Sequence, residues 1–259
     1  MKSFFKRLLD NAGLEVRRTR ATSKGFTSDP YLALKKMLTA MGRQQPVIFD
    51  VGAHKGETVA RFRELFPAAD IWCFEAFPDS ASQLEQRFSA DPAVHVTAAA
   101  VSDRTGSRTF YANANDSTNS LLPRNDASRR YYHSSASASE TLSVDCITID
   151  EHVQENKIDH IDILKFDIQG GELMAFEGAR ETLQNHRASL IYTEALFVPH
   201  YEGNPLFNDL WNHLAGYGYT LFDMYDLYHA GNGQLRFADA LFVSPQVRQN
   251  VIDAFPEEP

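Results

Sequence analysis

The chain has 259 residues, a hydrophobic fraction of 43% and a formal net charge of −9. These values fit one large domain with a full core, and the acidic balance argues against nucleic acid as the main partner, because phosphate binding requires a basic face. The two isolated cysteines, Cys73 and Cys146, form neither a disulfide framework nor a zinc site, so we expect a reducing, cytoplasmic location.

Residues 1–45 are predicted to form an N-terminal helical arm. The first nine residues mix basic and apolar side chains but lack the long apolar core and the cleavage site of a signal peptide. One interpretation is a short helix followed by a loose arm. The alternative is a helix that makes weak contact with a membrane surface or a partner. No stretch of the sequence has the apolar length that a transmembrane helix requires.

Predicted helices and strands alternate along the rest of the chain. In order, the first half is predicted to contain a helix at 31–41, strands at 46–51, 70–75 and 94–101, helices at 57–66 and 80–89, and an antiparallel extension at 107–111. The second half is predicted to contain strands at 142–149, 161–167 and 189–194, a short helix capped by Asp150, helices at 171–183 and 206–214, and closing strands at 219–225 and 237–243. This alternation predicts an α/β domain over residues 46–245, with a mostly parallel sheet, helices on both faces and a tail at 246–259.

The loop after the first predicted strand is the most informative segment. Asp50 ends the strand, and Gly52 and Gly56 bracket a tight turn before the next helix. Glycines let a backbone approach a ligand closely, and a helix start favours an anionic group. The spacing differs from the G-x-G-x-x-G loop of dinucleotide-binding proteins. It fits better a loop that holds the amino-acid tail of S-adenosylmethionine (SAM), although a glycine turn here is also an ordinary feature of such folds.

Each predicted parallel strand ends in an acid, at the sheet edge where ligands bind in this fold class. Glu75 lies 25 positions after Asp50 (75 − 50) and is placed to accept from both hydroxyls of a ribose, with Phe77 beside it for the adenine face. Asp103 is placed to meet the adenine amino group, although Asp103 and its neighbours also form an ordinary turn. Such acids are otherwise turn formers or helix caps.

Four motifs in this order resemble the FkbM family of SAM-dependent methyltransferases. They are Val47 to Gly56, Phe74 to Pro78, Leu164 to Leu173 followed by Glu177-Gly178-Ala179, and Glu194 to Tyr201. Phe166 departs from the smaller aliphatic residue that the family usually carries. The resemblance covers residues 46–245. It implies a Rossmann-like class I methyltransferase fold with a seven-stranded sheet whose last strand is antiparallel. It also implies methyl transfer to a hydroxyl, often on sugars of polysaccharides or glycolipids, or on natural products.

The expected site combines a cofactor pocket with a base for the acceptor hydroxyl. Asp167 is the first candidate for a general base or metal ligand, and Glu194 and His200 are the next candidates. Together with Gln169, the carboxylates offer oxygen ligands that suit Mg²⁺, so metal use stays open. His54 is interpreted as structural or cofactor-contacting. The residues expected to contact the cofactor are Asp50, Gly52, Ala53, His54, Gly56, Thr58, Glu75, Ala76, Phe77, Ser102, Asp103, Asp167 and Gln169.

Residues 112–140 change character and are rich in Asn, Ser, Ala and Arg. Long irregular segments of this kind are usually functional or disordered, so we expect a variable loop that acts as a lid on the acceptor side. Residues 117–122 offer hydroxyls and an amide, and Arg124, Arg129 and Arg130 are placed to meet an anionic acceptor. The partner is expected to be a small molecule or a glycan, and self-association stays open.

Two other function classes compete with this interpretation. A nicotinamide-dependent oxidoreductase on a similar sheet requires the G-x-G-x-x-G pattern, which the loop lacks. A non-catalytic SAM-binding protein would retain Glu75 but not an Asp167-type site.

Overall fold

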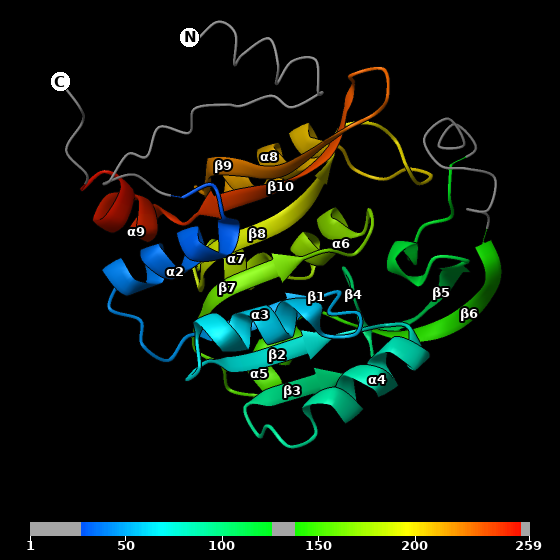
Figure 1. Ribbon diagram of the computed structural model, residues 1–259, viewed down its shortest axis with the longest axis horizontal. Helices are drawn as coiled ribbons and strands as arrows, with labels where there is room; N and C mark the ends of the chain where they lie inside the picture. Colours follow the sequence, from blue (N-terminus) through cyan, green and yellow to red (C-terminus); the bar gives the residue numbers. More distant parts are fainter. Residues whose placement is uncertain (1–26, 126–137, 255–259) are drawn as a thin grey trace, which may run out of the picture.

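A seven-stranded sheet forms the centre of the computed structural model, which describes residues 27–125 and 138–254 (Figure 1). The strand order is β3-β2-β1-β7-β8-β10-β9, and β10 runs antiparallel to both of its neighbours while the other pairs are parallel. This topology confirms the predicted fold class. The strands are β1 (Val47–Val51), β2 (Asp70–Phe74), β3 (Val94–Thr97), β7 (Ile161–Phe166), β8 (Ala188–Leu196), β9 (Thr220–His229) and β10 (Leu235–Val243).

Helices cover both faces of this sheet, as the alternation of strands and helices predicted. Along β1, successive side chains point to opposite faces, so Ile48 packs with one group of helices and Phe49 with the other. The first group contains α2 (Pro30–Ala40), α3 (Glu57–Leu65), α4 (Pro78–Phe88) and α9 (Pro245–Val247), the last followed by η4 (Arg248–Ile252). The second contains α5 (Ile149–Glu155), α6 (Glu172–Glu177), α7 (Arg180–Gln184) and α8 (Phe207–Gly216).

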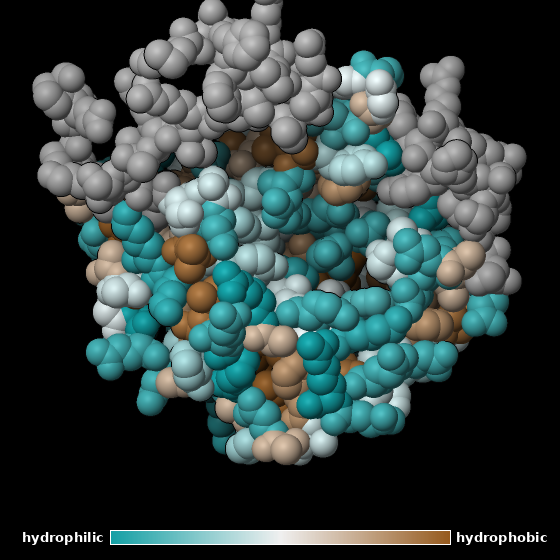
Figure 2. Space-filling model, viewed as in Figure 1, coloured by the Kyte–Doolittle hydropathy of each residue, from teal (hydrophilic) through white to brown (hydrophobic). Residues whose placement is uncertain are grey.

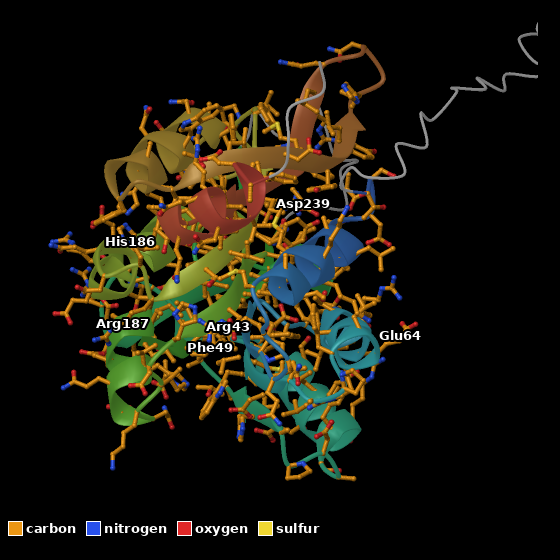
Figure 3. All side chains as sticks on the ribbon, turned by 90° about the vertical axis from the view of Figure 1, so that its left-hand side faces the viewer. Arg43, Phe49, Glu64, His186, Arg187 and Asp239 are labelled. Carbon is orange, nitrogen blue, oxygen red and sulfur yellow. The ribbon has the colours of Figure 1, made fainter. Side chains whose placement is uncertain are left out.

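Most helices expose polar side chains to solvent, whereas α6 buries its first residue, Glu172. Figure 3 shows Phe49 in the interior of the fold and Glu64 on the outer side of α3. The face seen in Figure 2 is mainly hydrophilic, with apolar side chains in scattered patches. Cys73 and Cys146 are both buried and free. Among residues 27–125 and 138–254, no helix is long and apolar enough to cross a membrane.

Helix α2 lies before residue 46, where the sequence predicts the start of the domain. Asp29 caps it by accepting from the backbone N–H of Leu32, and Pro30 occupies its first turn. Leu34 and Met37 are fully buried in the core of the first face. The helix therefore contributes to the core, and the boundary at 46 stays a prediction. The predicted helix and membrane contact of residues 1–26 fall outside the described residues.

The predicted strand at 94–101 is wrong as a single strand. It divides into β3 of the main sheet and β4 (Ala100–Val101), which joins a second, three-stranded sheet with β6 (Ala138–Ile147) and β5 (Gly106–Asn113). A hydrogen bond from Ala99 N to Thr97 O turns the chain between the two strands. An apolar run does not reveal such a turn, because both halves are apolar. The antiparallel extension at 107–111 is part of β5, which pairs with β6.

The predicted helix at 171–183 is also interrupted, and forms α6 and α7. Gly178 ends α6 at a point where an added Cβ would lie 2.0 Å from the carbonyl oxygen of Ser102. The sequence predicts that Asp150 caps α5, but this prediction is wrong. Thr148 caps that helix, whereas the Asp150 carboxylate accepts from the backbone N–H groups of Glu181 and Thr182 in α7. Asp150 thus caps α7 through N–H groups that lie 31 and 32 positions further along the chain.

Candidate functional site

A cavity of about 350 Å³ opens at the carboxyl ends of β1, β2 and β7, beside the three-stranded sheet. Its position agrees with the general rule for ligand sites in open α/β sheets. The lining comes from the loop after β1, the ends of β2 and β7, strands β4 and β5, and η1 (Asp116–Thr118). Among the residues predicted for cofactor contact, those that line it are Gly52, Ala53, His54, Thr58, Glu75, Ala76, Asp167 and Gln169.

The two glycines of the first loop are required by contacts within the chain. Gly52 has φ +83°, and a Cβ there would lie 2.0 Å from the carbonyl oxygen of Asp167. Gly56 has φ +85°, and a Cβ there would meet the side chains of Leu84 and Phe88 at 2.7 and 2.5 Å. Gly52 therefore lets β1 and β7 end side by side at the cavity, whereas Gly56 lets α4 approach the start of α3 and does not line the cavity.

Asp50, which was predicted to contact the cofactor, does not line the cavity. Its side chain is fully buried, and Oδ1 accepts a 2.8 Å hydrogen bond from the ammonium of Lys165 on the neighbouring strand. Lys165 is the residue of this pair that reaches the cavity lining. Burial opposes the charge of Lys165, but the carboxylates of Asp50 and Asp167 outweigh it and raise the pKa of the ammonium. The sequence signal for this pair is a lysine inside a strand that is otherwise apolar apart from Asp162.

The Glu75 carboxylate faces the cavity and is already held by the backbone. One oxygen accepts from His54 N and the other from Phe77 N, each at 2.8 Å. A carboxylate has about four acceptor positions, so both oxygens retain capacity for ligand hydroxyls. Burial raises the pKa of Glu75, and the two backbone hydrogen bonds counteract that rise. The contact to His54 N also fixes the first loop, whose residue 54 has φ +48°.

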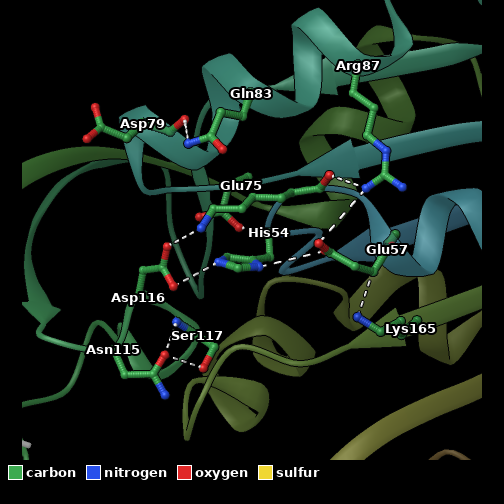
Figure 4. Close-up of polar contacts among 12 residues, drawn as sticks. His54, Glu57, Glu75, Asp79, Gln83, Arg87, Asn115, Asp116, Ser117 and Lys165 are labelled. Carbon is green, nitrogen blue, oxygen red and sulfur yellow. Dashed lines mark hydrogen bonds and ion pairs between the residues drawn. The ribbon is translucent and has the colours of Figure 1, made fainter.

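Helix η1 closes one side of the cavity by contacts that sequence analysis missed. Asp116 accepts a 2.5 Å hydrogen bond from Lys55 Nζ and lies 3.2 Å from His54 Nε2. Figure 4 shows the His54 ring between Asp116 and Glu57, whose carboxylate lies 3.8 Å from Nδ1. The hydrogen bond from Lys55 is the main reason why the pKa of Asp116 is lowered. These contacts attach the predicted lid to the loop after β1.

The predicted lid, residues 112–140, begins at the end of β5 and ends at the start of β6, and among its described residues those that line the cavity lie within 116–121. Ser117, Asn119 and Leu121 line the cavity, and Ser120 donates from Oγ to the carbonyl oxygen of Gln169 at 2.8 Å. Asn119 Oδ1 accepts from Asn113 N at 2.7 Å. Residues 126–137, which include Arg129 and Arg130, fall outside the described residues. The role of this segment as an acceptor lid stays a prediction.

Gln169 connects Asp167, the first catalytic candidate, with Glu194, one of the next two candidates. Its amide nitrogen donates to Asp167 Oδ1 and to Glu194 Oε2, both at 3.0 Å. Its amide oxygen accepts from the hydroxyl of Tyr201 at 2.9 Å. Asp167 is exposed in the cavity, whereas Glu194 lies behind Gln169 and does not line it. Burial, with Asp167 next in effect, raises the pKa of Glu194 well above its usual range.

The predicted magnesium ligands do not fit a metal ion. A cation between Asp167 and Glu194 would meet the N–H bonds of Gln169, because the amide oxygen of Gln169 is directed to Tyr201. Within residues 27–125 and 138–254, no group of three or more His, Cys, Asp or Glu side chains could hold a metal ion. We therefore assign no metal to this site.

Four further predicted residues lie outside the cavity lining. Ser102 is buried and donates to Asp103, which forms an ion pair with Arg108, because β4 carries both residues toward the three-stranded sheet. Phe77 packs against the core of that sheet instead of facing the cavity. His200 is buried 3.4 Å from Arg236, and burial followed by that positive charge lowers its pKa to about 4. The apolar side chains that line the cavity include Phe110 and Leu121.

Comparisons with known proteins place this site in context. The sequence matches the methyltransferase FkbM domain over residues 50–221. It is 28% identical over 177 residues to the 2-O-methyltransferase NoeI of Sinorhizobium fredii (strain NBRC 101917 / NGR234), a match that covers 65% of this chain and 71% of that protein.

The fold is also similar to solved structures. An rRNA methylase from Streptococcus thermophilus has a TM-score of 0.45 at 10% identity, with 85% of this chain and 99% of that chain covered. The 1,6-didemethyltoxoflavin-N1-methyltransferase of Burkholderia thailandensis, solved with 1,6-didemethyltoxoflavin and S-adenosylhomocysteine, has a TM-score of 0.43 at 12% identity, with 94% and 86% covered.

Proposed function

The chain belongs to the FkbM family of methyltransferases, and from this premise we propose that it transfers the methyl group of SAM to a hydroxyl oxygen of a sugar. Oxygen as the acceptor is supported by the name of its relative NoeI, a 2-O-methyltransferase. A sugar is what the family resemblance implies for the hydroxyl. The observation that carries the proposal is the Asp167 carboxylate, which is exposed in the cavity beside the glycine loop.

The cavity lining suits the parts of SAM. The backbone around Gly52 and Ala53 would hold the methionine portion, and the Glu75 carboxylate would accept from the ribose hydroxyls. Small side chains at the ends of β2 and β4, together with Phe110, leave an apolar space suited to a flat adenine ring. When bound, SAM supplies a methyl group carried on a sulfonium cation. The acidic lining at Glu57, Glu75, Asp116 and Asp167 favours such a cation.

Asp167 would take the proton of the acceptor hydroxyl. A sugar hydroxyl is weakly acidic, so a base within hydrogen-bond reach assists its attack on the methyl group. Gln169 holds Oδ1 of Asp167, and among the described residues no hydrogen bond occupies Oδ2. Glu194 is less suited to be the base, because its raised pKa favours the protonated form. His200 is less suited because it is buried outside the cavity with a lowered pKa.

Positioning would supply much of the remaining acceleration. Methyl transfer requires the oxygen, carbon and sulfur to lie in line, and holding two reactants in such a geometry lowers the barrier by several kcal/mol, on the order of 7–11 in well-oriented systems. The contacts of η1 to the loop after β1 restrict the open side of the cavity, where an acceptor would enter beside Asp167.

The proposal is tested by turnover with methyl-labelled SAM and a panel of mono- and oligosaccharides, with matched amino sugars for comparison. Mass spectrometry should locate the new methyl group on a sugar oxygen. Asp167→Asn should lower kcat at least 100-fold while the Kd for SAM, measured by calorimetry, changes less than about threefold. Methylation of nitrogen alone would overturn the oxygen acceptor. SAM binding without turnover of any acceptor would favour the non-catalytic alternative.

A further inference from the structure

We propose that Gln169 is a positioning residue that holds the Asp167 carboxylate for proton transfer, and that Tyr201 sets the direction of the Gln169 amide. The inference rests on the proposed function of Asp167 as the base. It assigns a function to a hydrogen-bonded chain of side chains from Tyr201 to Asp167 that lies beside the cavity.

Three hydrogen bonds fix the orientation of the Gln169 side-chain amide. Both N–H bonds are used, one to Asp167 Oδ1 and one to Glu194 Oε2, each at 3.0 Å. A rotation of the amide by 180° would bring its oxygen against these two acceptors, which is unfavourable. The Tyr201 hydroxyl opposes that rotation, because its single proton is shared between the amide oxygen at 2.9 Å and the carbonyl oxygen of Thr118 at 3.0 Å. The Tyr201 side chain is itself almost fully buried, with a relative exposure of 1%.

The backbone of Gln169 is held as firmly as its side chain. Its φ of +54° is uncommon for a residue other than glycine and is retained only where the surroundings stabilise it. Its carbonyl oxygen accepts from Ser120 Oγ at 2.8 Å. The Tyr201 hydroxyl also lies 3.0 Å from the carbonyl oxygen of Thr118 in η1. The Tyr201 hydroxyl therefore contacts both η1, which closes one side of the cavity, and the Gln169 amide, which holds Asp167.

The arrangement predicts a specific effect on Asp167. A hydrogen bond to the charged form of a carboxylate stabilises that form and keeps it ready to accept a proton. The other charged or titratable groups near Asp167 are Lys165, Asp50, Glu172, Glu194 and Asp239. Lys165 is already paired with Asp50, so Gln169 is the neutral donor that separates Asp167 from Glu194. Its loss should move the acidic limb of the pH profile of kcat to higher pH.

Three variants and one control test the inference. Gln169→Asn keeps an amide at a residue type that tolerates positive φ, but it is one methylene too short to bridge both carboxylates. Gln169→Glu keeps the length and replaces the donor with an acceptor. Tyr201→Phe removes only the hydroxyl. Tyr219→Phe is the matched control, because Tyr219 has the same 1% exposure and donates to the carbonyl oxygen of Ala188 at 2.7 Å, remote from the cavity lining.

We expect Gln169→Asn and Gln169→Glu to lower kcat at least tenfold and to move the acidic limb upward, with the SAM Kd changed less than threefold. Tyr201→Phe should lower kcat about three- to tenfold with the same direction of shift, whereas Tyr219→Phe should lose comparable stability and keep the wild-type pH profile. If Asp167→Asn is inactive while the Gln169 variants keep the wild-type kcat and pH profile, the positioning role is refuted alone. If Asp167→Asn remains active, the proposed base is refuted as well.

Discussion

Replacing Gly52 with alanine separates the need for a left-handed backbone from the need for space at the cavity. Gly52 and Gly233 have nearly identical φ angles, +83° and +84°. A Cβ at Gly233, in the turn between β9 and β10, would have nothing within 4 Å, whereas at Gly52 it would lie 2.0 Å from the carbonyl oxygen of Asp167. Gly233→Ala is therefore a matched control that carries the backbone strain without the collision.

The magnitude follows from this geometry. A left-handed alanine costs about 1–2 kcal/mol, and this cost applies to both variants. Ordinary contact begins at 3.4 Å, so the β7 end must withdraw by 1.4 Å (3.4 − 2.0) in Gly52→Ala. Overpacking costs roughly 1–3 kcal/mol or more, so Gly52→Ala should be destabilised by about 2–5 kcal/mol in total. For a domain of this size, each kcal/mol corresponds to about 2–4 °C in Tm.

Urea unfolding and calorimetry with SAM provide the readouts. Gly52→Ala should show the larger loss of stability and should weaken SAM binding at least tenfold, because the withdrawal moves Asp167 away from the loop that we propose to hold the cofactor. Gly233→Ala should bind SAM like the wild type. Equal destabilisation of the two variants would refute the steric argument, and unchanged SAM affinity in Gly52→Ala would refute the assignment of this loop to the cofactor.

Three further outcomes are expected. Lys165→Met leaves the Asp50 carboxyl buried without its partner and should lower the free energy of unfolding, measured in urea at pH 7, by about 3–5 kcal/mol. The double variant with Asp50→Asn should recover much of this loss, and additive losses would contradict the pairing. Burial raises the pKa of Glu172 from its ordinary 4.5 to about 7, so the folded state binds the extra proton and stability should fall as pH rises between these values, by at most about 3 kcal/mol. Glu172→Gln should reduce the dependence of the free energy of unfolding on pH in this range, and an unchanged slope would refute the role of Glu172. Dialysis against EDTA should leave turnover within twofold, whereas a loss restored by Mg²⁺ would contradict our assignment of no metal.

Much of the fold followed from local patterns in the sequence. The apolar run that ends at Asp50, the glycine turn after it and the amphipathic helix from Glu57 predicted β1, its loop and α3 within a residue or two. These features depend on side-chain periodicity and turn chemistry, which act over a few residues. The position of Glu75 at the end of β2 followed from the same reasoning, since its place in the chain fixes its place at the sheet edge.

The failures arose where pairing or packing between distant parts of the chain decides where a residue lies. Asp103 has the right position for a strand-end acid, but β4 leaves the main sheet and Arg108 pairs with the carboxylate. His200 has the right chemistry for a base, but its neighbours bury it outside the cavity. Gln169 meets Glu194 and Tyr201 across 25 and 32 positions, so no local pattern revealed its contacts.

The sequence by itself determined the fold class, the family and the glycine loop after β1, because the periods of strands and helices and the glycine turns depend on neighbouring residues. The tertiary structure decided which acids reach the cavity and which are already engaged by other groups. Asp50, Glu75, Asp103 and Asp167 look alike at strand ends, yet one is paired with a buried lysine, one is held by backbone N–H groups, one faces an arginine and one is exposed beside the loop. Burial and pairing across strands, which depend on the complete fold, make that difference.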